Sequence, residues 1–273
     1  MKLTGGVSAV SGPACNSVLI SATVNQLEQD DRSRVLNRLN LKVANLRADA
    51  EKIVILAERT PSNIEQVLKL LRRSEALEKS YVDWLQSLPP SWDIKTVAWI
   101  DSINEDINES SVHPGRVDSF AELWIAFTYS FICSCRLFIW TTILRCIAWL
   151  GEPQDYKLSP EYAVASRVCG QLVEDIVASV PYYFGWRGDK ALFMGVDRAN
   201  FACGTEKGSI KGVSGIFALL PIFTAATSDF ATPSQRLFLR GRMQSIYAST
   251  GMNQAAVLLH VIHPGLSMNC SYY

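Results

Sequence analysis

The stretch that decides the fold runs from residue 83 to residue 150. It reads DWLQSLPPSW (83–92), then PGRVDSFAELW (114–124), and closes in TTILRCIAWL (141–150). The paired prolines end a helix because neither can donate a helical hydrogen bond. The apolar, aromatic run 123–150 predicts a long helix, but Arg136 ends its longest charge-free part after 13 residues. A membrane span needs about 20 apolar residues, so we expect a buried core helix and no membrane contact.

Apolar residues recur every three or four positions on both sides of this stretch, as on one face of a helix. One such stripe consists of Leu36, Leu39, Val43, Leu46, Ala50, Ile53 and Ala57. It predicts an amphipathic helix docked on its own domain. The alternative is the coiled-coil seam of a homodimer, which is less well supported because the stripe spans only three heptads. Further helices are expected over residues 62–88, 160–181, 213–228, 233–250 and 253–263. Strand-like alternation is scarce, so the predicted fold class is all-α, as a single compact helical domain.

Composition sets the expected domain limits. Residues 1–27 carry Gly, Ser, Pro and Asn without a sustained period and predict a flexible leader. The helical domain is expected over 28–264, with an acidic loop insert at 101–118 and a tail at 265–273. Seven glycines between 185 and 215 predict a further loop. Five tryptophans are expected in or around the core: Trp84, Trp92, Trp124, Trp140 and Trp149.

The bulk charge bears on partners. The chain has 26 Lys and Arg and 26 Asp and Glu, so its formal net charge is zero. DNA-binding domains carry a basic excess that contacts phosphates, and we therefore expect no direct specific DNA binding. Seven cysteines without framework spacing indicate reduced, intracellular thiols.

Metal and catalytic signatures are missing from the sequence. It contains no C-x2-C pair, and Cys133 and Cys135 would point about 200° apart on a helix. His260 and His263 could share a face, but no third ligand is evident, so a structural pair is the better interpretation. The sequence also lacks a G-x-S-x-G elbow, a phosphate-binding glycine loop and a D-D-x-x-D motif. We expect no enzyme, no catalytic residue, no cofactor and no metal site.

Two arginines interrupt the apolar helix. Arg136 and Arg145 are nine residues apart, so they point to opposite sides, and at least one should be buried. A buried guanidinium needs a carboxylate, for which Glu122, Glu174 and Asp175 are candidates. We predict an internal ion pair between Asp175 and Arg136 or Arg145. The alternative interpretation is an anion-binding pocket for an effector.

The order of these segments resembles the regulatory region of fungal six-cysteine zinc-cluster transcription factors, the fungal-specific transcription factor domain. Three later segments also match that family in order and spacing: DIVASVPYYFG (175–185), GIFALLPIFTA (215–225) and LRGRMQSIYASTGMNQA (239–255). The resemblance covers about residues 75–261. It implies a helical regulatory domain in the nucleus that modulates transcription by RNA polymerase II through protein contacts or metabolite sensing. It implies no catalytic residues.

The sequence departs from the family because it lacks the zinc-cluster module. The resemblance implies zinc only in that module, and so none in this chain. The implied partners are therefore proteins of the transcription machinery, a separate zinc-cluster factor, or a small-molecule effector. The alternative function is a repurposed helical domain that acts as an enzyme of secondary metabolism.

Overall fold

The structure is a computed structural model that describes residues 13–54, 58–151, 153–186 and 212–261. The chain divides into two compact units, Met1–Lys42 and Val43–Tyr273. Helix α1 (Pro13–Val54) runs from the first unit into the second. Its backbone is helical from Pro13, in contrast to the flexible leader expected there, because no Gly or Pro interrupts residues 14–54. The expected leader over 1–12, the tail 265–273 and the loop over 187–211 lie outside the described residues.

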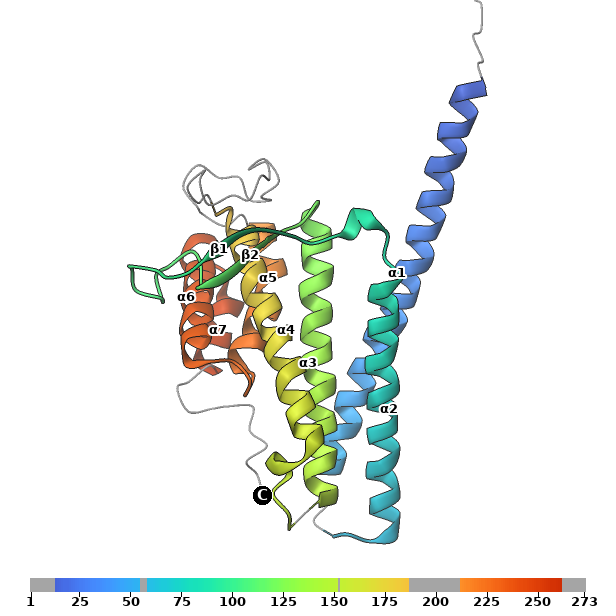
Figure 1. The fold of residues 1–273 in the computed structure, drawn as a ribbon, viewed down its shortest axis with the longest axis vertical. Coiled ribbons are helices and arrows are strands. Elements are labelled where there is room, and N and C mark those ends of the chain that lie inside the picture. Colours follow the sequence, from blue (N-terminus) through green and yellow to red (C-terminus); the bar gives the residue numbers. More distant parts are fainter. Residues whose placement is uncertain (1–12, 55–57, 152, 187–211, 262–273) are drawn as a thin grey trace, which may run out of the picture. The chain divides into compact units, whose positions relative to one another are not determined.

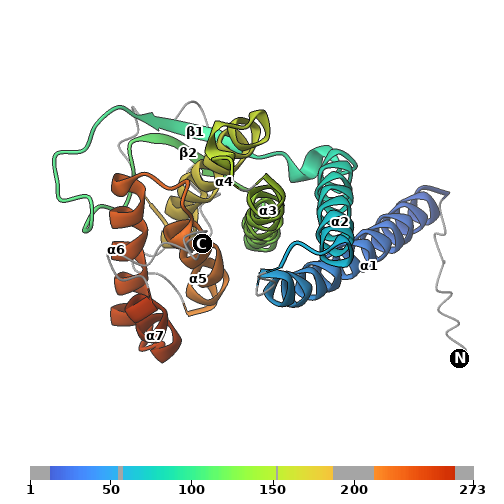
Figure 2. The same ribbon diagram turned by 90° about the horizontal axis from the view of Figure 1, so that it is seen from below.

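The second unit is built mainly from helices. Its described part contains α2 (Pro61–Gln86), α3 (Leu123–Gly151), α4 (Pro160–Phe184), α5 (Gly212–Thr227), α6 (Pro233–Thr250) and α7 (Asn253–Val261). Helix α3 lies between α2 and α4, and α5 covers both α3 and α4 (Figures 1 and 2). Helix α6 packs on α5 and carries α7. The predicted all-α class is confirmed, in a fold that is mostly helical.

Helix α3 is the central helix of this unit. It is long and apolar enough to cross a membrane, but 56% of its most apolar 18-residue segment is buried inside the protein. The buried side chains run from Ile125 to Trp149 and point in all directions around the axis. They are covered by α2, α4 and α5, as expected for the core helix of a helical domain. The expected core helix is confirmed.

A two-stranded antiparallel sheet departs from the predicted all-helical pattern. Strand β1 (Lys95–Ile100) pairs with β2 (Gly115–Ser119). Gly115 begins β2 with a φ of 127°, which favours glycine. The predicted insert 101–118 is therefore a loop only as far as residue 114. Strands this short are stabilised by the surface they cover, and β2 packs on α4.

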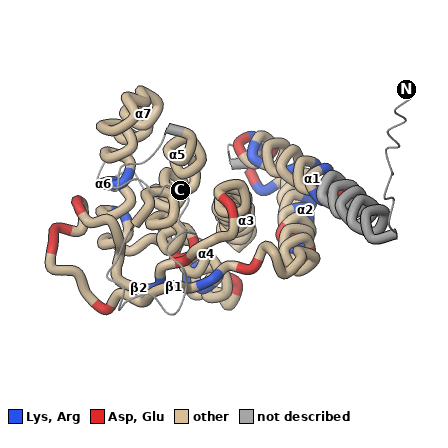
Figure 3. Tube along the Cα trace, turned by 90° about the horizontal axis from the view of Figure 1, so that it is seen from above, with Lys and Arg blue, Asp and Glu red and all other residues tan. Residues whose placement is uncertain are grey.

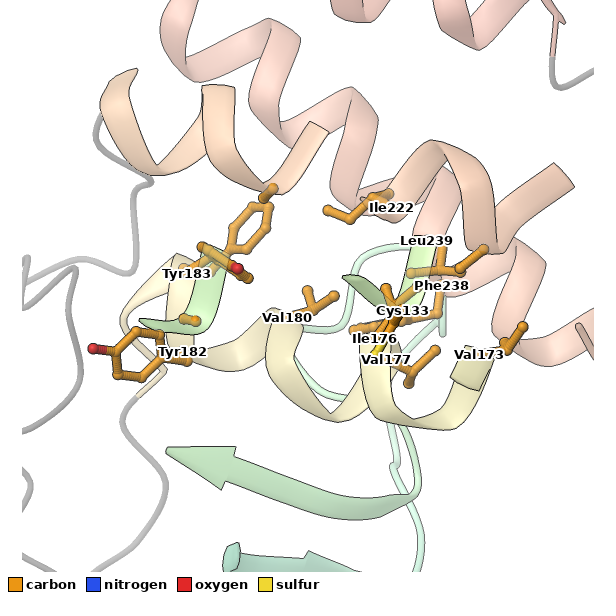
Figure 4. Packing of buried hydrophobic residues seen from close by; sticks show 14 of the residues in the cluster. Cys133, Val173, Ile176, Val177, Val180, Tyr182, Tyr183, Ile222, Phe238 and Leu239 are labelled. Carbon is orange, nitrogen blue, oxygen red and sulfur yellow. The ribbon is translucent and has the colours of Figure 1, made fainter. Parts of the chain in front are cut away.

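The core of the unit forms where α4, α5 and α6 meet (Figure 4). Helix α4 supplies an unbroken buried run from Asp175 to Phe184. It continues past Pro181 and ends at Gly185, whose left-handed φ of 66° closes the helix. Phe238 and Leu239 of α6 and Ile222 of α5 belong to the same cluster.

The tryptophans follow the prediction with one exception. Trp84 and Trp149 are buried, and Trp92 and Trp140 are half-buried at the edge of the core. Trp124 is 43% exposed. It lies in the first turn of α3, where its ring packs beside Phe127.

Candidate functional site

The β-hairpin is attached to the helices by a cluster of charged side chains around Arg116. Its Nε donates to Asp118 Oδ2 at 3.0 Å, and its Nη2 donates to Asp175 Oδ1 of α4. Arg116 is 24% exposed, while Asp118 and Asp175 are 3% and 11% exposed. A single guanidinium thus pairs with two buried carboxylates on two different elements.

Uncharged side chains donate further hydrogen bonds to these carboxylates. Asp175 accepts from the Tyr129 hydroxyl at 2.9 Å and from Gln171 Nε2 at 3.0 Å. Asp118 accepts from Thr96 Oγ1 at 2.9 Å. Burial raises the pKa of Asp118 and outweighs the opposing effect of Arg116. The cluster ties β1 and β2 to α3 and α4, and it carries one excess negative charge when both carboxylates are ionised.

The predicted ion pair of Asp175 has a different partner. Asp175 does meet an arginine inside the protein, but that arginine is Arg116 and not Arg136 or Arg145. The reason is the unpredicted hairpin, which brings β2 onto α4. Arg145 is half-buried and makes no salt bridge within the described part of the chain.

Arg136 of α3 meets Glu78 of α2. Its Nη2 and Nε donate to Glu78 Oε1 at 2.6 and 3.0 Å. Glu78 was not among the carboxylates proposed from the sequence. The sequence did contain an indication that Glu78 is ion-paired. Glu78 lies beside the buried positions Ser74, Leu77 and Tyr81 of α2, where an unpaired carboxylate would be costly.

The loop 101–114 of the hairpin is docked on α6 and is not a free insert. A Cβ at Gly241 would lie 1.7 Å from the backbone oxygen of Asn108, so the two backbones are in close contact. That oxygen accepts a hydrogen bond from Arg242 Nη2 at 3.1 Å. The side chain of Asn108 donates to Gln244 Oε1 at 3.3 Å. The hairpin therefore bridges α4 and α6.

Opposite charges meet at this contact. The loop contains Asp101, Glu105, Asp106 and Glu109 and no Lys or Arg, whereas α6 contains three arginines and no Asp or Glu (Figure 3). Arg242 is 6% exposed, and its guanidinium carbon lies 5.6 Å from the ring centre of Phe184. Burial lowers its pKa, while Glu109 and Glu105 oppose that effect. The acidic loop thus partly compensates a buried cation.

The described residues offer little chemistry beyond this scaffold. No three His, Cys, Asp or Glu side chains among them come close enough to hold a metal ion. His260 lies on α7, and its expected neighbour His263 is outside the described residues. Four cysteines of the described part are buried free thiols: Cys133, Cys135, Cys146 and Cys169. Burial raises the pKa of each of them, which keeps them protonated and unreactive.

One histidine, His113, lies at the contact between the loop and α6. Its Nδ1 donates to the Pro114 oxygen at 2.7 Å, which leaves Nε2 to accept from the Ser234 hydroxyl at 3.0 Å. Burial lowers the pKa of His113 more than the Pro114 bond raises it. The unfolded chain therefore takes up this proton first as the pH falls below about 6.5, and stability is lost there.

We expect the free energy of unfolding to fall more between pH 7.5 and pH 5.5 in the natural chain than in His113→Gln. Urea denaturation at both pH values measures the difference. The glutamine retains hydrogen-bonding groups but does not titrate. Equal losses in the two proteins would show that His113 is not the group responsible.

The fold and the site thus define a mostly helical protein with a hairpin clamped between helices. No family model matches the chain, and no solved structure matches it significantly. It is similar to the transcription factor dbaG of Emericella nidulans, with 22% identity over 199 residues. The aligned part covers 72% of this chain and 45% of that protein, so the chain spans less than half the length of this curated relative.

Proposed function

We propose that this chain is the regulatory domain of a nuclear transcription factor and modulates transcription by RNA polymerase II. The observation that carries the proposal is the similarity to a transcription factor over 72% of the chain. The order of segments that resembles the fungal-specific regulatory domain supports the same class.

In this proposal the chain acts through contacts with proteins, namely the transcription machinery or a zinc-cluster factor, and catalyses no reaction. Two features support protein contacts over a buried effector site. The charge cluster around Arg116 is filled by the protein's own donors. The hairpin also holds its loop firmly on α6, which gives the domain a defined outer surface.

A reporter experiment tests the proposal. The whole chain is fused to a sequence-specific DNA-binding domain and directed to a promoter in fungal cells. We expect reporter transcription to differ several-fold from that with the DNA-binding domain alone. The fusion carrying Arg116→Met, in which the hairpin loses its cation, should lose the effect at equal protein abundance. Unchanged transcription with the natural chain, at activated and basal promoters alike, would contradict the proposal.

A further inference from the structure

Helix α6 has a second, open face next to the one that carries the hairpin loop. This open α6 face consists of Pro233, Arg236, Leu237, Arg240, Gln244 and Tyr247. Residues spaced by three, four and seven positions share one side of a helix, so these six form one strip. Leu237 and Tyr247 are large apolar or aromatic side chains that are 41% and 45% exposed.

The charged residues of this face are all positive. Arg236 and Arg240 are four residues apart on it, and α6 has no carboxylate with which either could pair. Arg240 forms no salt bridge within the described ranges. Arg236 donates from Nη2 to the Ser228 oxygen at 2.9 Å, and its buried Nε has no partner there. The face therefore offers cations beside exposed apolar groups.

The adjoining flank of the same helix already binds an acidic segment of this chain. The hairpin loop, with four carboxylates and no cation, is seated there against Gly241 and Arg242. An acidic chain segment thus already complements one flank of α6, and Gln244 links the two surfaces through its bond with Asn108. Complementary charge selects the partner and speeds its association.

We propose that the open α6 face is a docking surface for an acidic peptide segment with interspersed apolar side chains, contributed by a partner protein. Its carboxylates meet Arg236 and Arg240, and its apolar side chains cover Leu237 and Tyr247. The inference rests on the proposed function, because it names the kind of protein that the regulatory domain contacts.

Fluorescence anisotropy with the purified whole chain tests this surface directly. The probe is a labelled 20-residue peptide that alternates Asp or Glu with Leu and Phe, and its Asn/Gln counterpart is the neutral comparison. We expect the acidic probe to bind with a micromolar dissociation constant that rises with salt. Arg240→Glu should weaken binding about tenfold. Lys69→Glu makes the same change of charge on α2 and should alter binding less than about twofold.

Tyr247→Ser provides a second variant in case Arg240→Glu does not fold, and it should also weaken binding. Three results would overturn the inference: no micromolar binding of the acidic probe, equal binding of the neutral peptide, or equal effects of Arg240→Glu and Lys69→Glu. Displacement of the probe by duplex DNA at equal charge would also overturn it, in favour of a nucleic-acid surface. Failed binding with an active reporter refutes the docking surface alone, whereas binding with an inactive reporter refutes the proposed function.

Discussion

Arg116→Met should lower the free energy of unfolding by about 3–5 kcal/mol, because two carboxylates then stay buried without a cation. Asp118 and Asp175 are almost fully enclosed, and neither has another salt-bridge partner in the described part of the chain. Methionine retains much of the aliphatic length of arginine, so the loss of stability measures the effect of removing the positive charge. Urea denaturation monitored by circular dichroism measures it. The loss should shrink as the pH is lowered, because burial raises the pKa of Asp118 and its carboxylate then takes up a proton.

Asp175→Ala tests the other side of the same cluster and should also be severely destabilising. It leaves the half-buried Arg116 with Asp118 and removes the acceptor of Tyr129 and Gln171. Glu174→Ala is the matched control, because Glu174 is the half-buried neighbouring carboxylate and is outside the cluster. It should change stability by less than about 0.5 kcal/mol. Equal, small effects of Arg116→Met and Glu174→Ala would show that the cluster does not hold the hairpin.

Gly241→Ala should detach the hairpin loop from α6 and cost about 1–3 kcal/mol, the usual range for forcing a carbon into a filled space. The new Cβ would lie 1.7 Å from the Asn108 oxygen and 2.6 Å from its carbonyl carbon. Both are backbone atoms, so no side chain can rotate away to make room. Hydrogen exchange of residues 101–114 should become faster, because the bond from Arg242 to Asn108 would be broken.

Gly170→Ala in α4 is the matched control for this substitution. No atom lies within 4 Å of its added Cβ, so alanine should stabilise that helix by about 0.5–1 kcal/mol. If Gly241→Ala were equally stabilising, the loop would not be packed against α6 as described.

The helices were predictable because their signals are local. Pro160 follows the capping residue Ser159 at the start of α4, and Gly185 ends that helix; each acts on backbone groups within one turn. At α2 the predicted start at residue 62 was close but not the same, since Thr60 caps the helix and Pro61 begins it. The long apolar run predicted α3 as a core helix because no other position in a helical domain could bury it.

The candidate site depended on contacts between distant parts of the chain. Arg116 and Asp175 are 59 residues apart, and Arg136 and Glu78 are 58 apart. A sequence shows that a buried charge needs a partner, but several carboxylates satisfy that need equally well. The prediction of Asp175 as an ion-paired residue was therefore right about the group and wrong about its arginine.

The sequence alone determined the helical class and most helix ends, because hydrogen bonding within a helix and its caps act over three or four residues. Only the tertiary structure decided the hairpin, the partner of Asp175 and the docking of the acidic loop on α6. Strands β1 and β2 are six and five residues long, too short for their pattern to specify pairing. A two-stranded sheet needs packing against another element for stability, and here β2 packs on α4. The loop has the composition of a free segment, yet Gly241 of α6 leaves space for its backbone and Arg242 supplies a donor for Asn108. Neither feature can be recognised before the two segments are brought together.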